Sequence, residues 1–148
     1  MMGLFDMLSI SASALSAERQ RAEVTSANLA NAETTHTEAG GPYVRKEVVF
    51  SEAGASPFAS VFNGIDRPGE APPGTVEISQ VVSDTAPPVM RYEPGNPDAN
   101  KEGYVAYPAI NPVTEMVDLM GATRAYGLNS SAVQAEKGMI SSALDILK

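Results

Sequence analysis

The chain has 148 residues, 18 acidic against ten basic side chains, a formal net charge of −8 and no cysteine. Without cysteine there can be no disulfides, thiolate metal sites or cysteine nucleophiles, and the acidic balance lacks the basic cluster typical of nucleic-acid or membrane surfaces. Because the first basic residue is Arg19 and no apolar run approaches about 18 residues, we expect neither a cleavable secretory signal nor a membrane span.

The chain begins with a long stretch that contains no proline, since ten of the eleven prolines lie between Pro42 and Pro108. Apolar residues recur in this stretch at intervals of seven: Leu8, Leu15, Ala22 and Leu29. Such spacing is typical of a helix that packs lengthwise on another helix. We therefore predict a helix over residues 4–32.

This predicted helix ends in the sequence SANLANAETT, residues 26–35, where Asn28 and Asn31 are three residues apart. Side chains at this spacing share one helix face, where they can bond to neighbouring helices and fix their register. The alternative for Asn31, with about equal weight, is that it only caps the end of the helix.

The middle of the chain holds most of the acidic surplus and several short alternating stretches. These stretches predict strands at residues 43–50, 75–82, 88–93 and 103–108. EPGN, residues 93–96, has the proline and glycine of a type II turn. Residues 51–74 are rich in small residues and proline and predict a loop, with FASVF at residues 58–62 as a short strand.

A second helix is predicted from Pro112 to near the C-terminus, with Asn111 as its N-cap and Pro112 in the first helical position. Its apolar residues form a strict seven-residue series: Leu119, Tyr126, Val133, Ile140 and Leu147. Three glycines interrupt it, Gly121, Gly127 and Gly138. Glycine in a helix is commonly tolerated where another backbone approaches closely, and the alternative is that these are weak or bent spots.

The predicted fold class is α+β, with two long terminal helices that pair as a coiled-coil layer and a small antiparallel β domain inserted between them. The corresponding segments are residues 1–35, 36–111 and 112–148. Two helices so rich in alanine and serine bury only a thin seam against each other, and helical stability in proteins comes mainly from packed faces. We therefore expect some of the packing partners to lie outside the chain.

The sequence contains little that could carry out catalysis. His36 is the single histidine, lies in a polar run and has no partner at metal-ligand spacing, so we expect an ordinary solvated loop residue. No calcium-loop, nucleophile-elbow or phosphate-loop motif is present. We expect no enzyme, no metal and no cofactor.

Several stretches resemble known proteins. SANLANAETT resembles the N-terminal signature of the flagellar rod and hook protein family, and GPYVRKEVVF, the run YEPGNPDANKEGYVAYPAINPVTEMVDLMGATRAYGLN and the closing ALDI are similar to one rod member of that family. The resemblance covers close to three quarters of the chain. It implies a non-enzymatic subunit of the flagellar rod that transmits motor torque, lies in the periplasm and leaves the cytoplasm through the flagellar type III export apparatus with an uncleaved N-terminus.

The resemblance also implies partners and contact residues. The partners would be further copies of the chain, other rod proteins, and the adaptor between rotor and export gate at the rod base, while nearness to peptidoglycan is left open. Both terminal helices would lie in an inner coiled-coil tube. The predicted assembly interface comprises Asn28, Leu29, Asn31, Met116, Met120, Arg124, Tyr126, Val133 and Ile140. The sequence departs from the family pattern at Gly127, which leaves the straightness of the second helix in question, and in residues 51–74, where no contacts carry over.

One alternative belongs to another class of protein. The chain could be a monomeric module that binds cell-wall glycan through its β domain, with the two helices forming a self-contained hairpin. A glycan hydrolase with paired carboxylates ranks third. Full helicity with protected amides in the isolated monomer would favour the glycan-binding module, and fraying ends would favour assembly.

Overall fold

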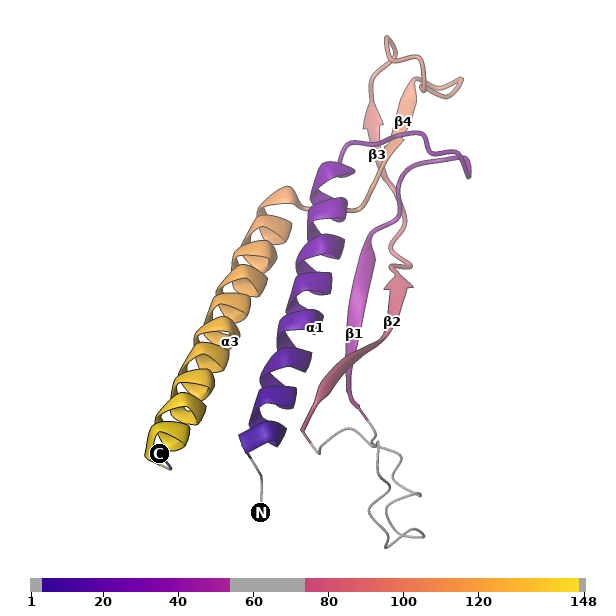
Figure 1. The fold of residues 1–148 in the computed structure, drawn as a ribbon. Helices are drawn as coiled ribbons and strands as arrows, with labels where there is room; N and C mark the ends of the chain where they lie inside the picture. Colours follow the sequence, from indigo (N-terminus) through magenta and orange to yellow (C-terminus); the bar gives the residue numbers. More distant parts are fainter. Residues whose placement is uncertain (1–3, 54–73, 147–148) are drawn as a thin grey trace, which may run out of the picture. The chain divides into compact units, whose positions relative to one another are not determined.

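The computed structural model describes residues 4–53 and 74–146, and Figure 1 shows their secondary structure. Along the chain, four short strands follow the first long helix and precede the second. This order confirms the predicted α+β class. The elements are α1 (Leu4–Ala30), β1 (Lys46–Glu52), β2 (Val76–Ser83), β3 (Val89–Tyr92), β4 (Tyr104–Tyr107) and α3 (Pro112–Ile146). No helix among these residues is long and apolar enough to cross a membrane.

Helix α1 ends at Ala30, two residues earlier than predicted. The Asn31 side chain donates from Nδ2 to the Ala27 carbonyl and accepts at Oδ1 from the Thr34 hydroxyl. The Asn31 amide donates to the same Ala27 carbonyl at 3.1 Å, and the next amide, of Ala32, turns to the Leu29 carbonyl at 3.3 Å, which tightens the end of the helix. Asn31 thus caps the helix, as one of the two interpretations of this residue required.

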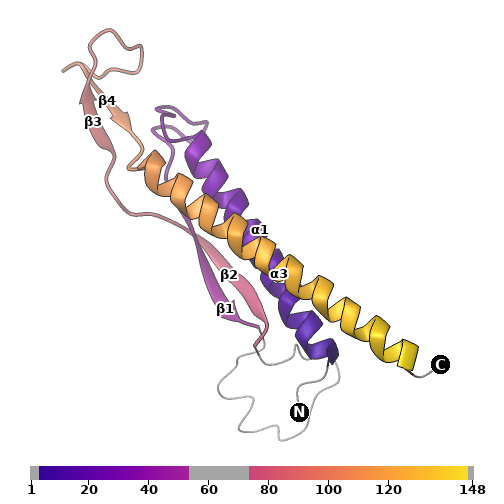
Figure 2. The ribbon, with the colours of Figure 1, turned by 90° about the vertical axis from the view of Figure 1, so that its left-hand side faces the viewer.

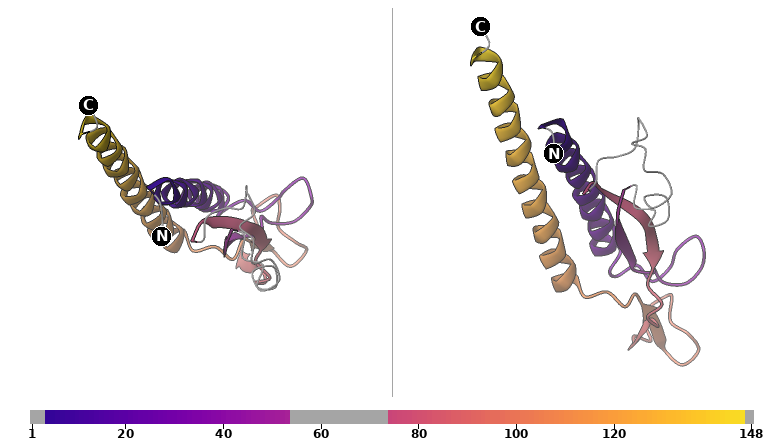
Figure 3. Two further views of the ribbon diagram at one scale, coloured as in Figure 1. Left: turned by 60° about the horizontal axis from the view of Figure 1, so that its bottom comes forward. Right: turned by 90° about the horizontal axis from the view of Figure 1, so that it is seen from below.

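Helix α3 begins where its sequence predicts. The Asn111 side chain accepts from the Val113 amide at 3.0 Å, and the Asn111 carbonyl accepts from the Glu115 amide at 3.1 Å. Together these bonds form the predicted N-cap. The helix then continues without a break past Gly127 (Figure 3), so this glycine does not interrupt the helical hydrogen bonding.

All four predicted strands are present, within three residues of the expected boundaries, and they form two separate two-stranded sheets (Figure 2). Strand β1 pairs with β2, and bonds beyond the strand ends join the amide of Ala53 to the Thr75 carbonyl and that of Asp84 to the Arg45 carbonyl. Strands β3 and β4 are antiparallel, with Val89 opposite Tyr107 and Tyr92 opposite Tyr104. β1 extends to Glu52, into the segment predicted as loop; FASVF lies outside the described residues.

The turn at residues 93–96 exists but is not of type II. The Asn96 amide donates to the Glu93 carbonyl at 3.1 Å, which closes the turn. A type II turn needs positive φ at Gly95, yet the glycines with positive φ are Gly40, Gly41, Gly74 and Gly103. A second turn follows at once, closed by the Ala99 amide donating to the Asn96 carbonyl at 3.0 Å.

The contacts divide the chain into two compact units, and each unit contains part of both helices. Unit 1 comprises Met1–Gln20, Val49–Gln80 and Ala122–Lys148, and unit 2 comprises Arg21–Val48 and Val81–Gly121. The division into residues 1–35, 36–111 and 112–148 stays a prediction.

The described residues bury few apolar side chains. The buried apolar residues among them are Ala17, Val105 and Ala122, together with Pro108. The buried polar set is larger and includes two glutamates: Ser11, Thr25, Asn28, Thr75, Glu115 and Glu136. Because buried polar groups must be hydrogen-bonded to be tolerated, the stability of this fold depends on their partners.

Candidate functional site

The first three turns of α3 carry an exposed apolar stripe. With 3.6 residues per turn, the first three turns place four apolar side chains at i, i+3, i+4 and i+7 on one face. These are Val113, Met116, Val117 and Met120, all of them exposed. Farther along the helix, Leu128, Met139 and Ile146 are also exposed. The helical period displaces these three side chains by up to about a quarter of a turn round the helix from the centre of that face. We call the side of α3 that bears Val113, Met116, Val117 and Met120 its outer face.

The glycines of α3 have empty space where a side chain would be. A Cβ built on Gly121, Gly127 or Gly138 meets no atom within 4 Å. The helical period places Gly127 and Gly138 on the outer face, beside Met120 and Met139. The described chain thus supplies no close backbone neighbour at these glycines, and the prediction of one remains for a partner outside the chain.

The structure separates the predicted interface residues of α3 into two groups. Met116, Met120 and Arg124 are exposed on the outer face. Val133 and Ile140 are half-buried, and the helical period places them and Tyr126 on the opposite side, with Glu115 and Ala122. Only the first group lies on the outer face; the role of each residue in assembly stays a prediction.

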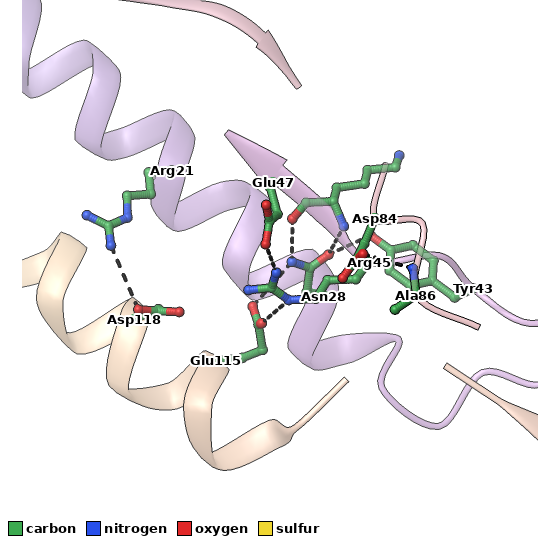
Figure 4. Close-up of polar contacts among 10 residues, drawn as sticks. Arg21, Asn28, Tyr43, Arg45, Glu47, Asp84, Ala86, Glu115 and Asp118 are labelled. Carbon is green, nitrogen blue, oxygen red and sulfur yellow. Dashed lines mark hydrogen bonds and ion pairs between the residues drawn. The ribbon is translucent and has the colours of Figure 1, made fainter. Parts of the chain in front are cut away.

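Asn28 lies at the centre of a polar cluster in unit 2, drawn in Figure 4, and its side chain is only 1% exposed. Its Nδ2 donates to the Lys46 carbonyl at 2.8 Å and to Glu115 Oε2 at 3.2 Å. Its Oδ1 accepts from the Lys46 amide at 2.9 Å and from the Tyr43 hydroxyl at 3.1 Å. The carboxamide therefore pairs with both backbone groups of Lys46, as a neighbouring strand would, at the residue where β1 begins.

Glu115 joins this cluster from the first turn of α3 and is 2% exposed. Its Oε1 accepts from Arg45 Nε at 2.6 Å, and Arg45 also pairs with Glu47 (Figure 4). A buried carboxylate is tolerated when it is paired and hydrogen-bonded, and both oxygens of Glu115 have partners. Three segments distant in sequence thus meet at one carboxylate.

The surroundings in this cluster raise the pKa of two of its groups, Tyr43 and Arg45. Burial raises the pKa of Tyr43, and the negative charge of Glu115 raises it further. Burial would by itself lower the pKa of Arg45, but the bonds and charges of Glu115 and Glu47 outweigh it and raise this pKa. Both shifts hold the cluster in its present protonation state, with neutral Tyr43 and charged Arg45.

Asn31 and Leu29 lie near this cluster in sequence but take no part in the hydrogen bonds described for it. Asn31 bonds within its own helix end, and Leu29 is half-buried. Asn28 makes its bonds inside the chain, whereas the sequence interpretation gave it contacts to neighbouring helices of other subunits. Its assignment to an interface stays a prediction that this geometry does not require.

A second buried glutamate lies in unit 1. Glu136 of α3 accepts at Oε1 from the Ser11 hydroxyl of α1 at 3.1 Å and is 5% exposed. Its Oε2 is buried without a hydrogen-bond partner in the described part of the chain. This carboxylate is therefore much less completely satisfied than that of Glu115.

A shallow groove in unit 1 lies between α1 and the β1–β2 sheet. Its lining is mostly small or hydroxyl-bearing and includes Ser9, Ser13, Ala17, Thr75 and Val76. The Ser13 hydroxyl of α1 accepts from the Val76 amide of β2 at 3.1 Å and so links the two walls of the groove. In residues 4–53 and 74–146, no group of three His, Asp or Glu side chains could hold a metal ion, and His36 is exposed in a loop.

Sequence reasoning did not identify Tyr43, Arg45 or Glu115 as members of a buried cluster. A signal was present in α3. Four residues before each member of the predicted apolar series lies a second seven-residue series: Glu115, Ala122, Asn129, Glu136 and Ala143. The two series have the a and d spacing of a heptad, so polar residues in one of them predict buried polar contacts.

Two family models match the chain. One described as "Flagella basal body rod protein" covers residues 8–35, and one described as "Flagellar basal body rod FlgEFG protein C-terminal" covers residues 101–146. The two matches include most of both long helices, the Asn28 position and the outer face of α3.

Curated relatives match over nearly their full length. FlgC, the flagellar basal-body rod protein of Bacillus subtilis (strain 168), is 43% identical over 152 residues, which cover 99% of this chain and 100% of the relative. The FlgC proteins of Borreliella burgdorferi and Escherichia coli O6:H1 are 36% and 37% identical, with at least 98% of each chain covered. The chain belongs to the FlgC family of flagellar basal-body rod proteins.

Proposed function

We propose that this chain is a structural subunit of the flagellar basal-body rod and that the outer face of α3 packs against neighbouring subunits. The observation that carries the proposal is the exposure of Val113, Met116, Val117 and Met120 on one helix face. Scattered exposed apolar residues need no explanation, but a contiguous apolar patch, such as these four side chains on the first three turns of α3, marks an interaction surface. The family models and the relatives are named for rod proteins, which supports the same role.

The neighbours in this proposal are further copies of the chain and other rod proteins. Head-to-tail contacts join two different surfaces of identical subunits, and where the rotation does not close they generate open helical assemblies, which suit a rod. Torque would pass through many long contacts along the helices, and no chemical step on a substrate is needed. The subunit would act in the periplasm after type III export and meet the rotor and export-gate adaptor at the rod base.

The other predicted interface residues enter the proposal in different ways. Arg124, exposed on the outer face, would contact a neighbour directly, as would Tyr126, which is exposed on the opposite side of α3. Leu29, Val133 and Ile140 are half-buried. They would contribute mainly through packing within the subunit, which stabilises the helices that carry them. The glycan-binding alternative gains no support from the relatives, and no contact of the β strands with peptidoglycan is part of the proposal.

The proposal is tested by replacing one apolar side chain of the outer face. Met120→Gln keeps helix propensity and size but introduces an amide into the proposed interface. We expect the variant to be made at the normal level yet to lower the subunit content of isolated basal bodies and the swimming radius in soft agar. The matched control is Met90→Gln, which makes the same change at an exposed residue of β3.

A second test separates monomer stability from assembly. Gly127→Ala should stabilise the isolated chain by up to about 1 kcal/mol, because alanine favours the helix and nothing occupies the space. If a partner backbone approaches there, the same methyl group should impair rod formation. Normal swimming by both Gly127→Ala and Met120→Gln would contradict the proposed interface.

A further inference from the structure

The carboxamide of Asn28 uses all of its hydrogen-bonding capacity. Its two N–H groups have two acceptors, the Lys46 carbonyl and Glu115, and its oxygen has two donors, the Lys46 amide and Tyr43. An aspartate has the same shape but no N–H groups. The bond between Asn28 and Glu115 therefore has a fixed polarity, with the donor on α1 and the acceptor on α3.

This bond lies directly behind the outer face. Glu115 immediately precedes Met116, and Val113, Val117 and Met120 belong to the same first three turns of α3. Because Arg45 and Asn28 each hold one oxygen of Glu115, the carboxylate is fixed on both sides. Fixing a side chain of the first turn fixes the rotation of the helix and hence the direction of its outer face.

We infer that Asn28 and Glu115 are positioning residues for rod assembly: their polarised bond sets the rotation of α3 at which the outer face fits a neighbouring subunit. This inference rests on the proposed function. Neither residue touches the neighbour. A buried polar contact that specifies register has precedent in coiled coils, where one asparagine can select the arrangement of helices.

The alternative is that the bond only adds stability to unit 2. Other nearby contacts also join α1 to α3, since Arg21 lies 3.8 Å from Asp118. That pair is more than a third exposed at both side chains and therefore contributes little. The buried Asn28–Glu115 bond is the contact whose polarity an experiment can reverse.

The experiment reverses the bond with two isosteric changes in the full-length chain, expressed from its own locus. In Asn28→Asp, two carboxylates face each other. In Glu115→Gln, an amide must point N–H groups at either Asn28 or Arg45, both of which are donors there. In the double variant, the glutamine can accept from Arg45 and donate to the new aspartate, which restores the bond with opposite polarity.

We expect each single variant to lower the amount of subunit in isolated basal bodies at least about tenfold, as for loss of a hydrogen bond to a charged group. The double variant should assemble at least about tenfold better than Asn28→Asp alone, since coupled residues are not additive. Its remaining defect would come from the Lys46 carbonyl, which loses its donor.

The control for stability is Val105→Ala, which makes a cavity at the fully buried core residue of β4 in the same unit. Thermal melting of each purified variant places them on one stability scale. If Val105→Ala melts no higher than Asn28→Asp yet assembles normally, the effect belongs to positioning. The inference is overturned if the double variant assembles no better than the worse single variant, or if Val105→Ala fails to the same extent.

The two proposals can fail separately. If the unchanged chain is missing from isolated basal bodies, the proposed function is wrong. If the unchanged chain is present but reversing the bond restores nothing, only the positioning role is wrong.

Discussion

Glu115 and Glu136 are buried glutamates of the same helix, each bonded to a side chain of α1, yet their surroundings differ. Glu115 has an arginine and an amide, so that both oxygens and the charge are matched. Glu136 has one hydroxyl, and its other oxygen is buried without a partner in the described residues. The helix thus contains one complete and one incomplete polar contact.

The difference shows that burial of a carboxylate alone says little about its contribution to stability. A paired buried charge resists removal, because the groups left behind lose their partner. A buried carboxylate with an unsatisfied oxygen already carries a desolvation penalty, so its removal can be neutral or favourable. The same substitution should therefore destabilise the protein at Glu115 and leave its stability unchanged or slightly raised at Glu136.

The largest effect is expected for Glu115→Met. The change leaves Arg45 and Asn28 without their buried acceptor and should lower the free energy of unfolding of unit 2 by about 3 kcal/mol. Urea titration with hydrogen exchange of residues 21–48 and 81–121 would measure it. A loss below about 1 kcal/mol would mean that the cluster adds no more than an ordinary hydrogen bond.

The matching change in unit 1 should be far milder. Glu136→Met removes the unsatisfied oxygen, and the Ser11 hydroxyl can turn to a carbonyl of its own helix. We expect a free energy of unfolding that is unchanged or raised by up to about 1 kcal/mol. Destabilisation as large as that of Glu115→Met would remove the distinction between the two sites.

A third effect concerns alkaline pH and unit 2. The pKa of Tyr43 is raised above 10.0, so in this range the unfolded chain loses the phenol proton before the folded chain does. The unfolded state then binds fewer protons, and stability must fall as the pH rises through 10.0 towards the folded-state pKa. Tyr43→Phe should flatten this decline in a pH series of melting temperatures, whereas an equally steep decline would exclude Tyr43 as its source.

The smallest effect is expected at Glu93, an exposed carboxylate beside the β3–β4 pair. Hydrogen bonds from Asn96 and then from Tyr107 lower its pKa below 4.5, so any contribution to stability is lost as the pH falls through the lowered value. An NMR titration should show the pKa rising in Asn96→Ala and less in Tyr107→Phe. We expect no resolvable change in unfolding, because exposed contacts are screened by solvent.

Much of the fold could be predicted because its signals are local. The proline-free ends with seven-residue spacing predicted both helices, Asn111 and Pro112 predicted the start of α3, and the alternating stretches predicted all four strands. The predicted turn type at Gly95 was wrong, since proline at the second position of a turn is compatible with both type I and type II, and Gly95 does not have the positive φ of type II. Boundaries shifted where a side chain such as Asn31 bonded the backbone.

The candidate site was less predictable. Met120 and Arg124 were predicted and lie on the outer face, but Tyr126, Val133 and Ile140 face the other side of α3. Asn28 was predicted to fix the register of neighbouring helices, while its partners within the chain, Lys46, Tyr43 and Glu115, come from two segments distant in sequence. Such partners cannot be read from spacing along one helix.

By itself the sequence determined the helices, the strands and the N-cap, because periodicity, proline and capping residues act over a few neighbours. The family came separately, from the resemblance of stretches such as SANLANAETT to known rod proteins. Only the tertiary structure decided which helix face stays exposed and which buried glutamate has its charge paired with an arginine. The physical reason is that burial and charge pairing depend on groups 18 to 125 residues apart, as in the contacts of Asn28 with Lys46 and of Ser11 with Glu136.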